Sequence, residues 1–453
     1  MVRNNPLAGG ALNTITTNVV GSGLTVQPQV DGEYLGLGEQ QVIDLQALFE
    51  RHWSAYSESQ FCTLDGDQSF VESQDLALRS CLERGDVFAM LPTRAPSRNY
   101  PYSLRIQLVE ADRVCNPDFQ RDTATRIAGI DRDGDGMAIT YHVANQFPSA
   151  YSSRSAIKWT SIPAVGSATG RRNVLHLYTK LRPGQSRGIP YLSTVIEPLR
   201  QLSSYTDNEL MASVVSSMFT VFVKSETGSG LGPMAPTAET GGSDSDEDYK
   251  LGNGAILDLL PNESVEIANP MRPNALFDPF VLAVLRQIGA RLELPFEILI
   301  KHYTSSYSAA RAAMLDAWKF FSSRRTWIAR RYCQPIYEAF VDELVATGRV
   351  QAPGYYADPM IRAAYTGSLW VGPPRGQIDP VKENQADGYA EDRGWKTAAQ
   401  NTSERGGDWE QNRKQRMREV AQSAEWKTQQ GAPMTTPASP TPSQQNRRVE
   451  YVG

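Results

Sequence analysis

The residues with the clearest metal-binding spacing are three aspartates in the segment Asp131-Arg-Asp133-Gly-Asp135-Gly. Alternating carboxylates followed by glycine open the calcium loop of an EF-hand, where they wrap around one ion. The twelfth position of that loop requires a bidentate glutamate, and here it is His142. Residues 139–143 also have the pattern of a strand rather than that of an exiting helix. These features favour an aspartate- and glycine-rich hairpin turn, with a metal-dependent nuclease that uses the three aspartates as the alternative.

Other signatures of catalysis or metal binding are missing from the sequence. The four histidines are far apart, and none belongs to an H-E-x-x-H motif: His52, His142, His176 and His302. The chain contains neither G-x-x-x-x-G-K-[ST] nor G-x-S-x-G, so it has no phosphate-cradling loop and no hydrolase elbow of those types. The four cysteines show no C-x-x-C spacing, which favours buried thiols: Cys62, Cys81, Cys115 and Cys333. We therefore expect no enzyme, no metal and no cofactor.

Length and composition limit the class of protein. With 453 residues, the chain exceeds one compact core, so two or more domains or an elongated subunit are expected. We find no run of about eighteen apolar residues, which disfavours a membrane channel. The N-terminus lacks the apolar region of a signal peptide, which predicts synthesis in the cytoplasm. A net charge of −5 argues against tight binding of nucleic acid, which depends on clustered lysine and arginine.

The elements that would position polar side chains are clearest between Phe277 and Leu344. The first is a helix with apolar residues three or four positions apart: Phe277, Val281, Val284, Ile288 and Leu292. Pro295 is expected to end it. A polar loop, Lys301 to Ser308, follows, and then a long helix from about Ser308 past Tyr332 that carries aromatic residues and arginines.

The rest of the chain has simpler patterns. Before residue 190, helices are predicted at 13–20, 40–52 and 70–82, and strands of a small antiparallel sheet at 86–91, 103–109, 137–143 and 174–178. A helix at 194–218 leads into strands at 219–224, 253–260 and 264–268, interrupted by residues 226–248, whose composition predicts a mobile loop. Residues 379–426 have a charged helical pattern.

Four stretches, in this order, resemble the portal (head-to-tail connector) proteins of tailed bacteriophages, specifically the lambda-like family. They are Val2-Arg-Asn-Asn-Pro-Leu-Ala-Gly-Gly with Asn18-Val-Val-Gly-Ser-Gly-Leu; Arg187-Gly-Ile-Pro-Tyr-Leu with Ile196-Glu-Pro-Leu; Leu294-Pro-Phe-Glu-Ile-Leu continuing to Leu315; and Trp370-Val-Gly-Pro with Ile378-Asp-Pro-Val-Lys-Glu. Lambda-like portals usually carry a further segment before the Arg-Asn-Asn motif. The present sequence begins almost at that motif, so either its start is truncated or this phage dispenses with the segment.

The resemblance implies an α+β portal fold with wing, stem, clip and crown regions. The implied order is a wing at 1–190, a stem helix at 191–218, a clip at 219–272 that includes the mobile loop 226–248, and a second stem helix at 273–295. A tunnel loop at 296–308, a long inner helix and wing at 309–378, a crown at 379–430 and a disordered tail at 431–453 follow.

The implied function is a dodecameric ring at one capsid vertex that nucleates procapsid assembly and conducts double-stranded DNA during packaging and ejection. Its partners would be further copies of the chain, the terminase large subunit, head-tail adaptor proteins, and the major capsid and scaffolding proteins, with no membrane. It would reside in the virion, and in the host cytoplasm during assembly. A mildly acidic channel wall suits DNA that must slide. The alternative is an adaptor or scaffold protein of prophage origin that forms no ring.

The resemblance to portal proteins implies roles for two sets of residues. The tunnel loop would present to DNA a cation, a titratable ring and hydroxyls, which can touch phosphates without holding them: Lys301, His302, Tyr303, Thr304, Ser305 and Ser306. The alternative is an ordinary connection between helices. The arginines of the long helix are predicted to form ion pairs between subunits rather than a DNA-binding face: Arg311, Arg324, Arg325, Arg330 and Arg331.

Overall fold

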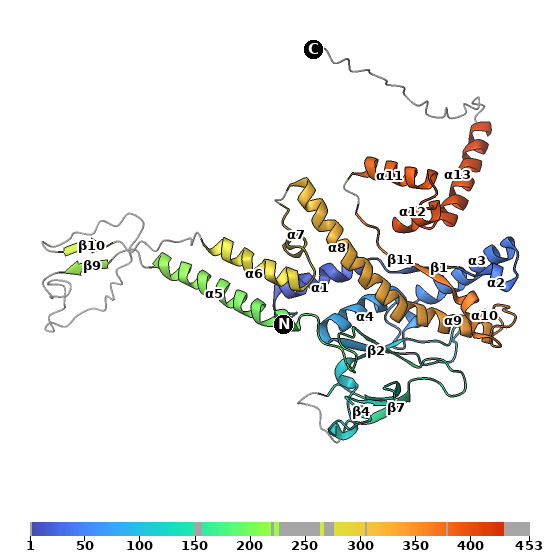
Figure 1. The fold of residues 1–453 in the computed structure, drawn as a ribbon, viewed down its shortest axis with the longest axis horizontal. Coiled ribbons are helices and arrows are strands. Elements are labelled where there is room, and N and C mark those ends of the chain that lie inside the picture. Colours follow the sequence, from blue (N-terminus) through green and yellow to red (C-terminus); the bar gives the residue numbers. More distant parts are fainter. Residues whose placement is uncertain are drawn as a thin grey trace, which may run out of the picture. The chain divides into compact units, whose positions relative to one another are not determined.

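The computed structural model describes residues 2–148, 156–218, 222–225, 263–266, 276–303, 306–376 and 379–429. The predicted loop 226–248, the predicted strand 253–260 and the tail 431–453 lie outside these residues. The chain divides into two compact units (Figure 1). Unit 1 comprises Met1–Ile15, Ser80–Asp86 and Tyr178–Phe320, and unit 2 comprises Thr16–Arg79, Val87–Leu177 and Phe321–Gly453.

Unit 1 is mainly helical. It contains α5 (Ile196–Met218), α6 (Phe277–Arg291), α7 (Phe296–Ile300) and the first part of α8 (Tyr307–Ile328). Tyr205 of α5 stacks on Phe277 of α6 with ring centroids 5.5 Å apart, and the Tyr191 hydroxyl donates to the Leu292 carbonyl at 2.7 Å. These contacts make α5 and α6 an antiparallel pair, which Figure 1 shows in green and yellow. A hairpin of β9 (Phe222–Ser225) and β10 (Glu263–Glu266) belongs to the same unit.

Unit 2 is built around an aromatic core. The Trp53 ring, on α3 (Glu39–Ser57), meets the rings of Phe70, Tyr337 and Phe340 nearly edge-on, at centroid distances of 5.0, 5.3 and 5.4 Å. Phe70 begins α4 (Phe70–Arg84), and the other two rings belong to α9 (Gln334–Ala346). Perpendicular rings are a favourable aromatic geometry. The core therefore joins segments that are almost 300 residues apart in sequence.

Two small sheets in unit 2 replace the single sheet that the strand pattern predicted. One has the order β3-β2-β8, formed by β3 (Gln107–Glu110), β2 (Asp86–Met90) and β8 (Val174–Tyr178). The other has the order β4-β5-β6-β7, formed by β4 (Arg126–Ile127), β5 (Ile130–Arg132), β6 (Ala138–Ala144) and β7 (Trp159–Pro163). The predicted strand 103–109 starts later than expected, because the N–H groups of Ser103 and Leu104 donate to the Glu343 carboxylate.

The remaining elements of unit 2 are short. They include α2 (Gly32–Leu35), α10 (Pro359–Thr366) and a two-stranded sheet in which β1 (Thr25–Pro28) pairs antiparallel with β11 (Ser368–Val371). The end of α1 (Pro6–Val19) also lies in unit 2. The charged stretch after residue 379 forms three helices, α11 (Pro380–Asp392), α12 (Ala398–Glu404) and α13 (Trp409–Gln429), because turns at Gly394 and Gly406 with positive φ interrupt it.

The long helix predicted from about Ser308 is continuous but not uniform. Between α8 and α9, residues Ala329–Cys333 form a π-helical turn, and the Gln334 N–H donates to the Ala329 carbonyl five residues back. Pro335 comes next; it has no N–H, and in a regular helix its ring would clash with the carbonyl four residues earlier. The wider turn thus lies where the proline would disturb an α-helix.

Candidate functional site

The turn between α6 and α7 is a Schellman motif without the usual glycine. The Glu293 N–H donates to the Ala290 carbonyl at 3.4 Å, and the Leu294 N–H donates to the Gly289 carbonyl at 3.0 Å. Glu293 occupies the left-handed region with φ of 51°. This motif ends α6 at Arg291, so the prediction that Pro295 ends the helix was wrong by four residues; Pro295 precedes α7 instead.

Gly289 allows this turn to form. A Cβ atom at that position would lie 2.7 Å from the Leu294 carbonyl oxygen, which is closer than Cβ atoms approach in proteins. Leu294 itself is buried. The stretch that supports the predicted tunnel loop is therefore held by backbone hydrogen bonds and close packing rather than by the proline alone.

The predicted DNA-contacting residues follow a second left-handed turn. Lys301 ends α7 with φ of 56°, and the N–H groups of Lys301 and His302 both donate to the Glu297 carbonyl. The side chains of Lys301, His302 and Tyr303 are exposed. They therefore share a short exposed segment of unit 1, where they could meet a large ligand.

The remaining residues predicted to contact DNA are Thr304, Ser305 and Ser306. Thr304 and Ser305 lie outside the described residues. Ser306 accepts the Ala309 N–H at its hydroxyl oxygen, at 3.4 Å, which is the arrangement of an N-cap. The Ser306 side chain thus has a local role at the start of α8.

The five predicted interface arginines are not equivalent. Arg330 and Arg331 are exposed on the π-helical turn, whereas Arg311, Arg324 and Arg325 are half-buried. Arg325 donates from Nη2 to the Asn18 carbonyl at 2.9 Å and from Nε to the Val19 carbonyl at 3.2 Å. Burial lowers the pKa of its guanidinium. Because Arg325 is engaged within its own chain, we leave it out of the proposed subunit contacts below.

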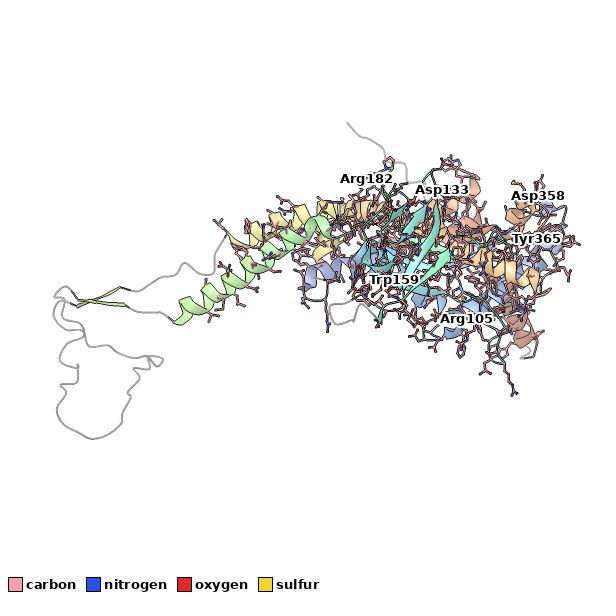
Figure 2. The ribbon with its side chains drawn as sticks, turned by 90° about the horizontal axis from the view of Figure 1, so that it is seen from below. Arg105, Asp133, Trp159, Arg182, Asp358 and Tyr365 are labelled. Atoms are coloured by element: carbon pink, nitrogen blue, oxygen red, sulfur yellow. The ribbon has the colours of Figure 1, made fainter. Side chains whose placement is uncertain are left out.

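The three aspartates of the EF-hand-like segment lie in a hairpin, as predicted, with Asp131 paired to Thr140 across β5 and β6. The Asp133 carboxylate accepts the N–H groups of Asp135 and Met137, which caps the turn; Figure 2 labels Asp133 there. Asp131 binds Arg126 at 2.6 Å and His142 at 2.8 Å. Within the described part of the chain, no group of three or more acidic, histidine or cysteine side chains is placed to hold a metal ion.

Unit 1 leaves several large apolar side chains of its helices exposed. Leu210, Met211 and Val214 are exposed on α5. Leu276 and Phe280, at the start of α6, are 74% and 51% exposed. Periodicity identifies an apolar face but does not say whether the same chain covers it.

No described helix has the length and apolar character that a membrane span requires.

Two curated relatives match almost the whole chain. The portal protein of Escherichia phage N15 is 24% identical over 445 residues, covering 92% of this chain and 82% of the relative. Portal protein B of Escherichia phage lambda is also 24% identical over 446 residues, covering 93% and 82%.

Solved structures from gene transfer agent (GTA) particles are also similar. The neck of the native GTA particle, computed with C12 symmetry, has a TM-score of 0.43 at 13% identity, covering 89% of both chains. The virion of the native GTA particle gives 0.41 at 14% identity with the same coverage. The sequence profile described as "Phage portal protein, lambda family" matches residues 1–325, well over half of the chain. The chain therefore belongs to the lambda family of phage portal proteins, as its sequence motifs predicted.

Proposed function

We propose that the chain assembles into a dodecameric ring at one capsid vertex and that double-stranded DNA passes through the ring during packaging and ejection. The observation that carries this proposal is the exposed apolar surface of α5 and α6, formed by Leu210, Met211, Val214, Leu276 and Phe280. Leu210 and Val214, and likewise Leu276 and Phe280, are four residues apart and so lie on one side of their helix; exposed apolar patches of this kind mark binding interfaces. Copies related by rotation can cover such a surface by a head-to-tail contact that closes into a ring.

The arginines of the long helix supply a polar complement to this apolar contact. Arg330 and Arg331 are exposed, and Arg311 and Arg324 are half-buried. Arginine suits ion pairs at interfaces because its planar guanidinium can bind a carboxylate with two hydrogen bonds. We assign these four arginines to contacts between neighbouring copies.

The exposed segment Lys301, His302 and Tyr303 is the part that we assign to the channel. A single lysine and a histidine offer few cations, so each contact with a phosphate would be weak and readily broken. The net charge of −5 fits a wall along which DNA moves without sticking. The hairpin of β9 and β10 would form the clip that meets the terminase large subunit and the head-tail adaptor proteins. The capsid and scaffolding proteins would bind elsewhere on the ring in the host cytoplasm.

Negative-stain imaging and native mass spectrometry of the full chain test the ring. We expect the wild type to form rings and L210E to shift the population to folded monomers, because a carboxylate would be buried without a partner in the interface. M137E is the matched control, since Met137 is 66% exposed on the hairpin between β5 and β6. A wild-type chain that stays monomeric at all concentrations would favour the non-ring adaptor.

The channel assignment needs a separate test in packaging particles. K301A and H302A should change packaging velocity or DNA retention while leaving ring formation intact. K382A provides a control at another exposed lysine, on α11. Unchanged packaging and retention in both loop variants would remove these residues from the channel.

A further inference from the structure

Two basic side chains of unit 2, those of Arg349 and His52, contact Tyr102. The guanidinium carbon of Arg349 lies 5.1 Å from the centre of the Tyr102 ring, and the His52 ring meets the same tyrosine edge-on at 6.2 Å. Arg51 adjoins His52 on α3. Among the described residues, none of these three side chains forms an ion pair. The two arginine charges are therefore not paired directly with a carboxylate.

Hydrogen bonds show which atoms of this cluster are available. The Tyr102 hydroxyl donates to the His52 carbonyl at 3.1 Å, so its oxygen accepts from Nδ1 of the His52 ring, also at 3.1 Å. Among the residues that the structure describes, Nε2 is the imidazole nitrogen without a partner. Arg349 donates from Nη2 to the Pro101 carbonyl at 2.8 Å, which occupies one of its five N–H groups.

Arginine supplies the positive charge of this cluster. Glu343 is the acidic group that acts on Tyr102, and its two carboxylate oxygens accept the N–H groups of Ser103 and Leu104. Desolvation lowers the pKa of His52, and the charges of Arg349 and Arg51 lower it further. The segment 93–99, which precedes Tyr102 in sequence, is exposed and contains Arg94 and Arg98.

We propose that Arg51, His52 and Arg349 form a binding site for a phosphate group, with the arginine N–H groups and the His52 Nε2 as donors. Guanidinium groups match the geometry of tetrahedral oxyanions and bind them with charge-assisted hydrogen bonds. A bound dianion would balance the two arginine charges and favour protonation of His52. The phosphate can come from free inorganic phosphate or from the backbone of nucleic acid, because both present the same oxygen atoms.

Sulfate is the probe for the first experiment, since it keeps both charges over the range, about pH 5 to 8, in which histidine titrates. Isothermal titration calorimetry on the full chain should show that affinity rises as pH falls through the pKa of His52, because the bound anion favours protonated imidazole. H52Q should remove this pH dependence. R349Q and R51Q should each weaken sulfate binding about tenfold, the loss of one charge-assisted contact.

The matched control is R413Q on α13. The Arg413 guanidinium also lies 5.1 Å from an aromatic ring, that of Trp409, but no histidine accompanies it. Its loss should leave sulfate affinity unchanged. Equal weakening by R413Q and R349Q, or sulfate binding with no pH dependence in the wild type, would overturn the proposal.

Measuring the binding of a short DNA duplex distinguishes free phosphate from the nucleic-acid backbone as the source of the bound phosphate group. Weaker duplex binding in R349Q and R51Q, with a shallower dependence on salt, identifies the nucleic-acid backbone as the source. Unchanged duplex binding combined with weakened sulfate binding identifies free phosphate. If polyglutamate binds while sulfate does not, the site recognises an acidic protein segment and the phosphate proposal is wrong.

Discussion

The guanidinium of Arg325 closes the C-terminal end of α1. The last carbonyls of a helix have no partner within it, and those of Asn18 and Val19 accept hydrogen bonds from this side chain. A cation is also favoured there by the helix dipole. A Cβ atom on Gly372 would lie 2.7 Å from Arg325 Nε, so the side chain is closely enclosed. At the residue scale, Arg325 contributes to the folding of unit 2.

Replacing Arg325 should therefore lower the stability of the folded subunit without preventing ring assembly. We expect R325Q to lower the free energy of unfolding by about 2 kcal/mol, because two helix-end carbonyls lose a charged donor. Urea denaturation followed by circular dichroism measures the change. The exposed Arg330 is the control, and R330Q should stay within about 0.5 kcal/mol of wild type. Equal losses in the two variants would contradict the capping role.

The ion pairs of Asp131 predict a pH dependence. The hydrogen bond from Arg126, followed by that from His142, holds the pKa of the Asp131 carboxyl below its usual value. Because its pKa is lower in the folded than in the unfolded chain, ionised Asp131 stabilises the fold above the unfolded-state pKa, and this contribution is lost as pH falls through the folded-state value.

Thermal unfolding from neutral to strongly acidic pH checks this expectation. D131N should be less stable than wild type at pH 7, and the difference should disappear in acid. D135N is the control, because the exposed Asp135 side chain forms no hydrogen bond or ion pair within the part of the chain that the structure describes; it should give a constant difference. A D131N deficit that persists at low pH would show that the ion pairs are not its cause.

At the scale of elements, the turn between α6 and α7 depends on one close approach of backbone to backbone. Gly289 makes room for the Leu294 carbonyl, while Glu293 takes the left-handed conformation that costs a residue with a Cβ atom about 1 kcal/mol or more. The element that presents Lys301 to Tyr303 thus starts from a crowded turn. Its geometry should be sensitive to a single methyl group.

Two glycine-to-alanine changes within helices of unit 1 should have opposite signs. G289A should destabilise the protein by roughly 1 to 3 kcal/mol, because the added methyl group overlaps the Leu294 carbonyl. G10A, in α1, meets no atom within 4 Å and should stabilise it by roughly 0.5 to 1 kcal/mol through helix propensity. Chemical denaturation measures both. A stabilising G289A would mean that the turn rearranges freely.

For the whole molecule, membership of the lambda portal family and the uncovered apolar surface of α5 and α6 support the same assembly. A subunit that keeps large apolar side chains exposed gains free energy by association, since burial stabilises by about 25 cal/mol per Å². In the proposed ring, Arg330 and Arg331 would add polar contacts that fix the register between copies. Ring assembly and subunit folding should thus be affected by substitutions at different residues.

The double variant R330E/R331E should reduce the fraction of chain in rings about tenfold, because charge reversal replaces attraction by repulsion across the interface. Its monomer should have the same circular dichroism spectrum as the wild type, which shows that the subunit remains folded. K319E on α8 is the matched reversal, at a lysine that is 81% exposed and paired only loosely with Asp316. Mass photometry at fixed concentration gives the ring fraction. Full assembly of the double variant would exclude these arginines from the interface.

The sequence by itself determined the family, the positions of most helices and the hairpin around Asp133. These features depend on motifs and on apolar periodicity, which are properties of residues close together in the chain. Only the tertiary structure decided that Arg325 caps α1, that Glu343 binds the start of the segment leading to β3, and that α6 ends before Pro295. The same holds for the cluster of Arg51, His52 and Arg349 at Tyr102. The end of α6 is set by a local turn that lacks the usual glycine, so the sequence gives no clear signal for it. The partners of Arg325, Glu343 and Arg349 come from segments distant in sequence, so no local pattern could have identified them.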